Sequence, residues 1–221
     1  MRVIGTVGLP GSGKGEAAAV AEERGVPVVT MGDVIREECR RRGLDPAEHH
    51  GAVAKALREE EGPAAIADRT VPAVNDAAAA ADADVVLVDG LRSTVELERF
   101  REAFGEGFLL VAVEAPFDLR AERLGARGRD DSDVDVEALR KREERELAFG
   151  MGEVIDAADV TIDNTGTLAA FRRRVADLLD GERGRTDGAP EADRARGSGT
   201  READGARETN GTREADAGGR P

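Results

Sequence analysis

Aromatic residues, cysteine and lysine are all scarce in this chain of 221 residues. There is no Trp or Tyr and there are only six Phe, so a core has to be built largely from small aliphatic side chains. The single cysteine, Cys39, cannot form an internal disulfide, which excludes a secreted fold held by disulfides. No apolar run reaches the length of a membrane span, and the start MRVIGTVGLPG resembles a strand rather than a signal peptide. These absences predict a soluble, cytoplasmic protein that does not bind membranes.

Acidic residues outnumber basic ones, with 46 Asp and Glu against 32 Lys and Arg, and the formal net charge is -14. Only three of the basic residues are lysine: Lys14, Lys55 and Lys141. An acidic, lysine-poor balance is typical of halophilic proteins, because carboxylates retain water and high ionic strength screens their repulsion. The same charge opposes binding to nucleic acid, so we predict no nucleic-acid partner. Composition leaves the oligomeric state undetermined.

Residues 181–221 differ in composition from the rest of the chain. They contain no Leu, Ile, Val, Met or aromatic residue, and the pentapeptide TREAD occurs at 200–204 and again at 212–216. Such a segment cannot bury enough apolar surface to offset the entropy lost on ordering. We therefore predict a folded domain over residues 1–180 and a disordered, low-complexity tail over 181–221. A docking peptide is the alternative interpretation of the tail.

Short apolar runs alternate with amphipathic segments through residues 1–180. Most of these runs are rich in Val, Ile or Leu without regular alternation, which is typical of parallel strands buried on both faces. Alternating strands and helices predict an α/β fold, a three-layer sandwich around a five-stranded parallel sheet. The expected strands are Arg2–Val7, Val26–Thr30, Asp84–Asp89, Phe108–Val113 and Val160–Asp163.

Local patterns also predict several helices. Ser93 and Glu96 form a capping-box pattern ahead of an apolar face, and residues 168–179 carry apolar residues at core spacing, starting with Leu168. The stretch 35–81 is longer than one crossover between parallel strands requires. We expect two or three extra helices there, forming a flap over the ends of the strands.

The first strand is followed by a glycine-rich loop of the form G-x-x-x-x-G-K and then by an alanine-rich helix. This is the phosphate-binding (Walker A) pattern in its required setting. The glycines let backbone N–H groups face a phosphate, the helix dipole favours negative charge, and the lysine reaches the terminal phosphates of ATP. A glycine-rich turn with a chance lysine is the alternative. The predicted nucleotide-binding residues are Gly8, Leu9, Pro10, Gly11, Ser12, Gly13, Lys14 and Gly15.

Gly15 stands where the general pattern has a Ser or Thr that binds Mg²⁺. The metal must then be held by the nucleotide, by water and by a carboxylate elsewhere. Asp89 is the candidate, because it ends an apolar strand in the Walker B form and strand ends of a parallel sheet meet beside the loop. We expect Asp89 to bind Mg²⁺ through water. A turn residue at a strand end is the alternative role.

Polar residues follow two neighbouring strands. Thr30, Asp33 and Arg36 follow the second strand, and Arg92 comes shortly after Asp89. Two arginines at adjacent strand ends would clamp a second phosphate opposite the loop, since a guanidinium group binds phosphate oxygens bidentately. If the acceptor is a hydroxyl group, Asp33 is the candidate general base. Because arginine is abundant here, a solvated surface role is the alternative for each arginine.

A third group of basic residues lies further along the chain. By spacing, its first three members share one face of a helix. Either these residues pair with acids on solvated helices, or residues 120–134 form a short cationic lid that closes on a transferring phosphoryl group. The residues alone leave both interpretations open. The group consists of Arg120, Arg123, Arg127, Arg129 and, on a helix expected from about Val134, Arg140, Lys141 and Arg142.

The segments GLPGSGKG, TMGDVIR, VDGLR and RLGAR resemble, in this order, signatures of adenylate kinase and related nucleoside monophosphate kinases. Residues 1–180 as a whole are more similar to an archaeal family of adenylate-kinase-related P-loop proteins, some likened to dephospho-CoA kinases. The blocks that carry this similarity are Asp89–Arg92, Arg127–Asp131 and Arg142–Gly150. The resemblance implies a P-loop NTPase fold of the nucleoside monophosphate kinase type, with ATP and Mg²⁺ as ligands.

The resemblance also implies roles for individual residues. Lys14 and Asp89 would act on the transferring phosphate, and Thr30, Asp33, Arg36 and Arg92 would form the acceptor side. The arginines that embrace the phosphates in the family would correspond to Arg123, Arg127, Arg129 and Arg142.

Two departures from adenylate kinase limit the resemblance. Only one residue separates Arg127 from Arg129, where many adenylate kinases have a long lid. The segment after Arg36 keeps little of the adenylate kinase acceptor pocket, so AMP is not implied. Asp159–Asn164 resembles the last strand and adenine-side loop of dephospho-CoA kinases instead.

Two functions are therefore predicted, in order of preference. The first is a phosphotransferase that moves the γ-phosphoryl group of ATP to a nucleotide or another small phosphorylated acceptor. The alternative is a nucleotide-dependent switch or ATPase that acts through a protein partner. The two arginine-containing turns favour the first, because an ATPase needs no clamp for an acceptor phosphate. The preference for ATP over GTP stays open.

Overall fold

The computed structural model describes residues 1–127 and 136–181. The predicted tail beyond Gly181 and the part of the predicted lid that contains Arg129 lie outside the described residues. The side chain of Arg127 lies outside them as well.

Five parallel strands form one sheet in the order β2-β3-β1-β4-β5, as the sequence predicts. β1 lies at the centre and pairs with β3 on one side and β4 on the other. β2 begins at Val28 rather than at Val26, because the Val26 N–H bonds back to Ala21 and Pro27 has no N–H to donate. The strands are β1 (Arg2–Val7), β2 (Val28–Thr30), β3 (Val85–Asp89), β4 (Phe108–Glu114) and β5 (Val160–Asp163).

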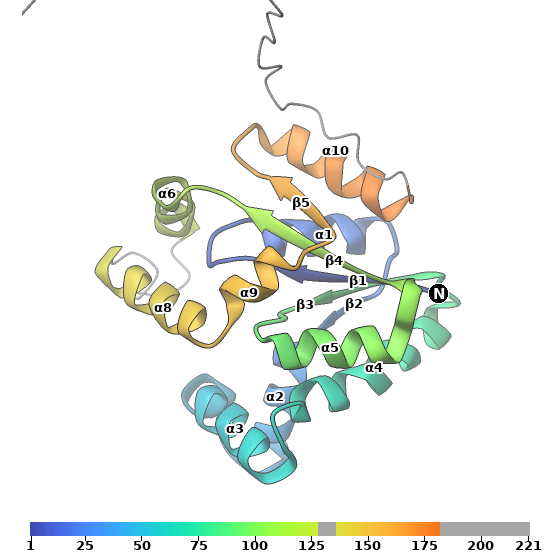
Figure 1. Ribbon diagram of the computed structural model, residues 1–221, viewed down its shortest axis with the longest axis vertical. Coiled ribbons are helices and arrows are strands. Elements are labelled where there is room, and N and C mark those ends of the chain that lie inside the picture. The colour runs from blue at the N-terminus through green and yellow to red at the C-terminus, as the bar shows by residue number, and fades with distance from the viewer. Residues whose placement is uncertain (128–135, 182–221) are drawn as a thin grey trace, which may run out of the picture. The chain divides into compact units, whose positions relative to one another are not determined.

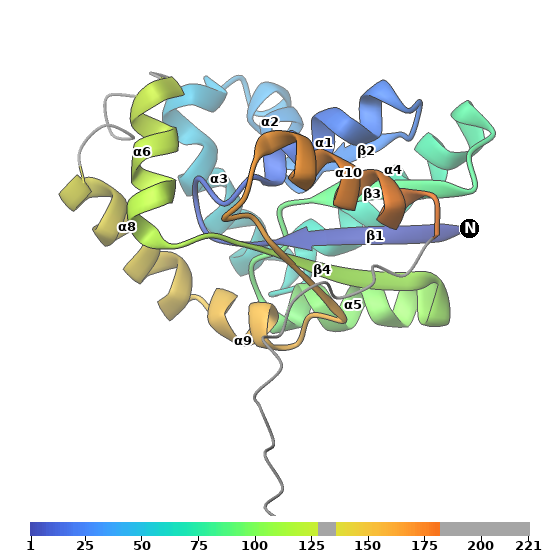
Figure 2. The same cartoon turned by 90° about the horizontal axis from the view of Figure 1, so that it is seen from above.

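Helices cover both faces of this sheet and make the predicted three-layer sandwich (Figures 1 and 2). α1 (Lys14–Glu23) and α10 (Leu168–Leu179) lie on one face, and α4 (Ala65–Ala81), α5 (Thr94–Phe104) and α9 (Met151–Asp156) lie on the other. The carboxyl ends of the strands point toward the remaining helices. These are α2 (Met31–Arg41), α3 (Pro46–Glu61), α6 (Phe117–Arg127) and α8 (Val136–Ala148).

The core divides into two apolar clusters, one on each face of the sheet. In β1, Val3 and Val7 belong to one cluster and Ile4 belongs to the other. In β3, Val86 and Val88 belong to the first cluster and Leu87 belongs to the second. Successive side chains of a strand point to opposite faces, so a strand covered on both faces is apolar throughout. This burial explains why these strands show no alternation of polar and apolar residues in the sequence.

The predicted cap of α5 is present, since the Ser93 side chain accepts a hydrogen bond from the Glu96 N–H. The apolar face of α5 then packs on the sheet, where the Phe100 and Phe108 ring centroids lie 5.6 Å apart. One prediction for α10 is wrong: Leu168 is 59% exposed. It is the first residue of the helix, directly after the Thr167 cap, and it precedes the turn at which α10 reaches the sheet.

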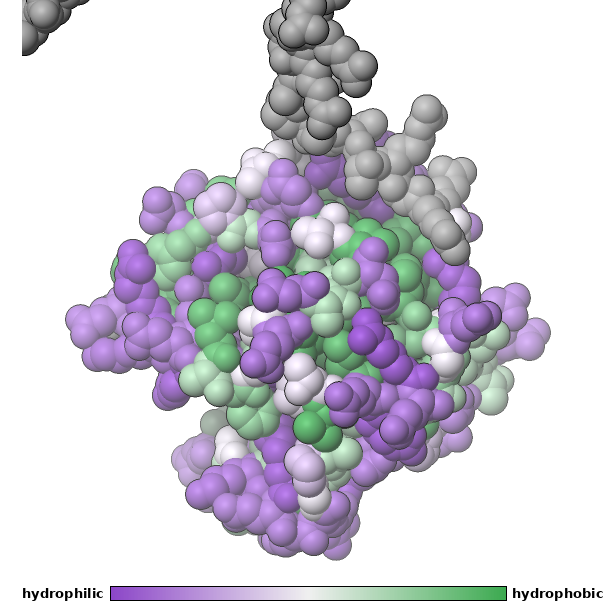
Figure 3. Space-filling view, viewed as in Figure 1, coloured by the Kyte–Doolittle hydropathy of each residue, from purple (hydrophilic) through white to green (hydrophobic). Residues whose placement is uncertain are grey.

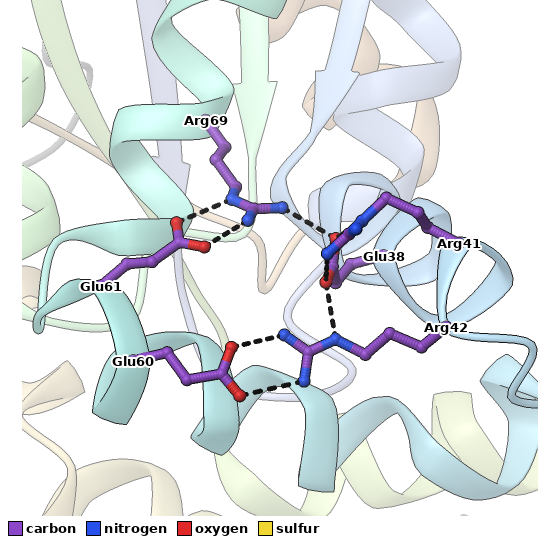
Figure 4. Close-up of polar contacts among 6 residues, drawn as sticks. All are labelled: Glu38, Arg41, Arg42, Glu60, Glu61 and Arg69. Carbon is purple, nitrogen blue, oxygen red and sulfur yellow. Dashed lines mark hydrogen bonds and ion pairs between the residues drawn. The ribbon is translucent and has the colours of Figure 1, made fainter.

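The predicted flap consists of α2, α3 and α4, which are joined by charged side chains, here termed the Glu38 network (Figure 4). The buried Glu38 carboxylate accepts hydrogen bonds from Arg41, Arg42 and Arg69. Arg42 also binds Glu60 of α3, and Arg69 of α4 also binds Glu61. These hydrogen bonds hold the pKa of Glu38 well below its ordinary value, and the one from Arg41 has the largest effect. The three helices are therefore joined through one buried negative charge and the arginines around it.

Within the ranges 1–127 and 136–181, no helix combines the length and the apolar character needed to cross a membrane.

Candidate functional site

The glycine-rich loop connects the end of β1 to the start of α1, at the carboxyl edge of the sheet. Its backbone depends on glycine at two closely packed positions. Gly8 has φ +152°, and a Cβ there would lie 2.4 Å from the Val113 carbonyl oxygen. Gly13 has φ +122°, and a Cβ there would lie 2.4 Å from the Asn164 side-chain nitrogen. A loop shaped this way leaves the backbone accessible to a phosphate, as the Walker A pattern requires.

Lys14 is the first residue of α1, and its side chain turns back over the loop. Its Nζ donates a hydrogen bond to the Gly8 carbonyl oxygen at 2.5 Å. Burial lowers the pKa of Lys14, although the negative charges of Asp89 and Glu146 oppose this shift. A partly desolvated ammonium group bound only to backbone carbonyls has a strong tendency to bind an anion.

Asp89 ends β3 next to the loop, as predicted. In the register of the sheet it lies opposite Thr6 of β1, and the Thr6 hydroxyl donates a 2.7 Å hydrogen bond to Asp89 Oδ1. Within the part of the chain that the structure describes, no residue donates a hydrogen bond to the second carboxylate oxygen, which can accept one from a water on a metal ion. Among the described residues, no group of three or more His, Cys, Asp or Glu side chains could hold a metal by itself. A cation at Asp89 would need ligands from a bound nucleotide.

One cavity of 670 Å³ brings eight of the predicted site residues together. Its volume lies within the usual range for a small-molecule site. Asp33 is not among the lining residues. It is 65% exposed and forms an ion pair with Arg36, at 2.6 Å. The predicted residues that line the cavity are Gly8, Pro10, Lys14, Thr30, Arg36, Asp89, Arg92 and Arg142.

The lining of this cavity, here termed the acceptor cavity, is positively charged. Six cationic side chains face three carboxylates, although the chain as a whole has a net charge of -14. On the face that Figure 3 shows, hydrophilic residues gather over α3 and α8, two of the helices that border the cavity. A cationic cavity in an acidic protein favours an anionic ligand. The cations are Lys14, Arg36, Arg58, Arg92, Arg142 and Arg145, and the acids are Asp89, Glu96 and Glu146.

Three comparisons relate this arrangement to known proteins. An AAA domain family model matches residues 7–140. A UPF0200 protein of Halobacterium salinarum is 58% identical over 179 residues, which cover 81% of this chain and 93% of the relative. A UPF0200 protein of Methanosarcina barkeri is 46% identical over 180 residues, which cover 81% of this chain and 95% of the relative. This chain belongs to the UPF0200 family. The predicted resemblance to an archaeal P-loop family is thereby confirmed.

A solved structure supports the fold of this UPF0200 member. TT1252 from Thermus thermophilus superposes with a TM-score of 0.59 and 21% identity, over 83% of this chain and 98% of the other. The family model and the glycine-rich loop identify a P-loop domain, and the comparison with TT1252 supports its α/β fold.

Sequence reasoning missed a pair of residues in the acceptor cavity. Arg58 of α3 donates a 3.0 Å hydrogen bond to the buried Glu96, and its guanidinium group lies 4.8 Å from the centre of the Phe149 ring. The other Glu96 oxygen accepts from the Arg92 backbone N–H. Glu96 is recognisable in the sequence only as a capping residue, and Arg58 only as one arginine of a charged helix. Together they fix the turn that carries Arg92.

His50 and Arg145 are also lining residues that the sequence did not indicate. Burial and the nearby charges of Arg36 and Arg92 lower the pKa of His50. The imidazole is therefore favoured in its neutral form beside the two predicted phosphate-binding arginines. Adjacent histidines in a polar helix carry no sequence signal for such a role.

The arginines of α6 have different surroundings from one another. Arg120 is buried, donates to the Pro10 carbonyl of the loop and pairs with Glu143 of α8. Arg123 donates a 2.8 Å hydrogen bond to the Asn164 carbonyl, and Asn164 donates in turn to the Ser12 carbonyl of the loop. Arg120 thus contacts both the loop and an acid of α8, while Arg123 lies on the β5 side of the loop. Arg123 is not among the residues that line the acceptor cavity, and the side chain of Arg127 lies outside the described residues.

A second, smaller cavity of 400 Å³ lies on the side of the loop that faces β4 and β5. Ser12, Arg120 and Thr165 contribute to it, with apolar residues from β4 and α9. The Ser12 hydroxyl is buried there, and no group in residues 1–127 or 136–181 forms a hydrogen bond with it. The phosphate loop therefore lies between two cavities, of which only the larger is strongly cationic.

Two glycines of the loop provide a matched test of its geometry. Gly13→Ala is expected to lower the free energy of unfolding by about 1–3 kcal/mol and to weaken nucleotide binding, because a Cβ would be strained and would meet Asn164. Gly15→Ala adds the same methyl group two positions later, where nothing lies within 4 Å, and should change stability by less than about 0.5 kcal/mol. Thermal unfolding and nucleotide titration measure both effects. Equal tolerance of the two substitutions would contradict the described loop geometry.

Proposed function

We propose that this UPF0200 protein is a phosphotransferase that moves the γ-phosphoryl group of ATP to a nucleotide or another small molecule that already carries a phosphate. The observation that carries the proposal is the acceptor cavity, in which Lys14 of the loop and Asp89 of the Walker B strand face Arg36, Arg92 and Arg142. A protein that only hydrolyses ATP has no need for arginines opposite the loop.

The loop would hold the triphosphate of ATP through its backbone N–H groups and the start of α1. Lys14 would exchange its hydrogen bond to the Gly8 carbonyl for bonds to the β- and γ-phosphate oxygens. No reorganisation of the loop is needed for this, because the ammonium group already lies over it. Asn164 and Arg123, which brace the loop from the β5 side, would keep it in place while the phosphate is transferred.

Arg36 and Arg92 would hold the phosphate of the acceptor. They follow β2 and β3, neighbouring strands whose ends place both guanidinium groups in the same cavity as Lys14. Arg142, Arg127 and Arg129 would neutralise the charge on the transferring group, which is spread over three oxygens in the loose transition state. Of these three, Arg142 is the one whose side chain is described, and it lines the cavity.

A bound Mg²⁺ would supply positive charge against the phosphate oxygens of ATP. Gly15 has no hydroxyl group to offer it, and the space around Gly15 is open. Asp89 would therefore act through a water ligand, with its carboxylate oriented by the Thr6 hydroxyl. This arrangement suits a metal that keeps several waters.

The surroundings of Asp33 favour a phosphate over a hydroxyl group as the attacking acceptor. Asp33 is bonded to Arg36 and lies outside the cavity lining, so it is poorly placed as a general base. An acceptor phosphate is already ionised and needs no strong base. The apolar part of the cavity, with Ile35, Leu91 and Phe149 among its lining residues, would hold the rest of the acceptor.

The decisive experiment follows ADP release from Mg-ATP in molar KCl. The protein is offered a panel of nucleoside monophosphates, dephospho-CoA, other phosphomonoesters, or water alone. Acceleration by one acceptor, with the phosphorylated product identified by mass, supports the phosphotransferase. Equal ADP release with every addition would contradict it and would favour the switch or ATPase that acts through a protein partner.

A further inference from the structure

The carboxylate of Glu146 lies between two of the arginines in the acceptor cavity. Its Oε1 accepts a hydrogen bond from Arg92 Nη1 at 3.3 Å and one from Arg142 Nε at 3.3 Å. The Glu146 side chain is only 11% exposed, whereas Arg92 and Arg142 are 47% and 42% exposed. An internal anion therefore already contacts both groups that would bind phosphate.

These contacts join parts of the chain that are distant in sequence. Arg92 follows β3, while Arg142 and Glu146 lie one turn apart on α8. Burial lowers the pKa of Lys14, and the charge of Glu146 is one of the charges that oppose this shift, so the carboxylate acts on the loop lysine as well. Glu146 therefore interacts both with the two arginines and with the lysine of the loop.

These two hydrogen bonds are longer than hydrogen bonds between arginine and a carboxylate usually are. Hydrogen bonds between guanidinium groups and carboxylates are typically about 2.7–2.9 Å long and often bidentate. Glu146 instead shares one oxygen between two arginines at 3.3 Å. A phosphate dianion has more oxygens and more charge and would bind both guanidinium groups better. Because arginine cannot lose its proton, the two positive charges need a counter-ion whether or not an acceptor is bound.

We propose that Glu146 is an internal competitor for the acceptor's phosphate. In the ligand-free protein it occupies the anion position between Arg92 and Arg142, and a bound phosphate displaces it. The carboxylate then limits the affinity of the clamp and keeps weaker anions out of it. This inference rests on the proposed function for the meaning of the anion position, whereas its test measures binding and not turnover.

The test measures binding of inorganic phosphate by calorimetry in molar KCl. The loop is first saturated with a non-hydrolysable Mg-ATP analogue, so that phosphate can bind only outside it. Glu146→Gln keeps the size of the side chain and removes its charge, and it should tighten phosphate binding by about tenfold, since one nearby repulsive charge is lost. Arg92→Ala in the same background should abolish the tightening, which shows that the phosphate is bound at the clamp.

Glu144→Gln is the matched control. It removes the same charge from the same helix, but Glu144 is exposed and is not a lining residue of the acceptor cavity. Its effect on phosphate affinity should stay within about twofold, because exposed charges are screened in molar salt. If Glu146→Gln does not fold, Glu146→Asp withdraws the carboxylate from both arginines and should give a smaller tightening.

Unchanged or weaker phosphate binding in the Glu146 variants would overturn the proposal, because it would show that Glu146 positions the arginines instead of competing at them. The result is independent of turnover. If no acceptor accelerates ADP release and Glu146→Gln still tightens phosphate binding, the proposed function fails and the internal competitor remains. If an acceptor is found and phosphate binding does not tighten, the proposed function stands and the internal competitor is ruled out.

Discussion

Lys14→Ala should reduce ADP formation from Mg-ATP by about a thousandfold or more, since a positioned cation on the transferring phosphate contributes effects of this size. In the structure the Lys14 ammonium group is half-buried over the loop, and its one close hydrogen bond is to a backbone carbonyl. Removing it leaves the glycine loop and the dipole of α1 intact. Nucleotide binding should therefore weaken less than turnover does, and a comparison of single-turnover rates with calorimetric affinities measures both.

Lys55→Ala is the control for this substitution. Lys55 lies on the surface of α3, 76% exposed, and its ion-pair partner is Glu59 at 3.6 Å. The substitution removes the same charge and the same side chain from an already acidic protein, and turnover should stay within about twofold because exposed charges are strongly screened. Similar losses in both variants would mean that net charge, not the position of Lys14, controls the activity. An undiminished rate in Lys14→Ala would contradict the proposed phosphate site itself.

The sheet was predictable because its strands are short, apolar and buried on both faces. The glycine loop was predictable because its pattern is local, and the placement of Asp89 followed from the rule that parallel strand ends meet at one edge. The boundary of β2 was not predictable from apolar content, because it depends on Pro27 and on the bond between Val26 and Ala21. Leu168 fits the helical period and is nevertheless exposed, since the period alone does not tell where a helix reaches the sheet.

The acceptor side was only half predictable. Arg36 and Arg92 follow strands and could be placed, but Arg58, Arg145 and Glu146 lie on charged helices where every position resembles its neighbours. What distinguishes them is how α3 and α8 pack around the cavity, and a single sequence contains no local signal for that packing. The same limit applies to the Glu38 network, whose acid and bases look like ordinary helix surface charges.

Glu38→Gln should lower the free energy of unfolding by about 3 kcal/mol, the lower end of the range for breaking a buried ion pair. Glu38 is 2% exposed and joins arginines from α2 and α4. The loss should not reach the upper end of that range, because Arg42 and Arg69 keep Glu60 and Glu61 as partners. Chemical denaturation in molar KCl measures the change. Glu37→Gln, which removes the same charge from an exposed neighbouring position, should cost less than about 0.5 kcal/mol.

The effect of Glu38→Gln should also depend on pH. The arginine hydrogen bonds hold the pKa of Glu38 well below its ordinary value of 4.5, so the ionised carboxylate is favoured in the folded state. A depressed pKa contributes stability that is fully present above the unfolded pKa and is lost as the pH falls toward the folded pKa. The difference in unfolding free energy between the wild type and Glu38→Gln should thus be constant near neutrality and shrink below about pH 4.5. A difference that does not change with acidification would mean that the hydrogen bonds of Glu38, and not its charge, hold α2, α3 and α4 together.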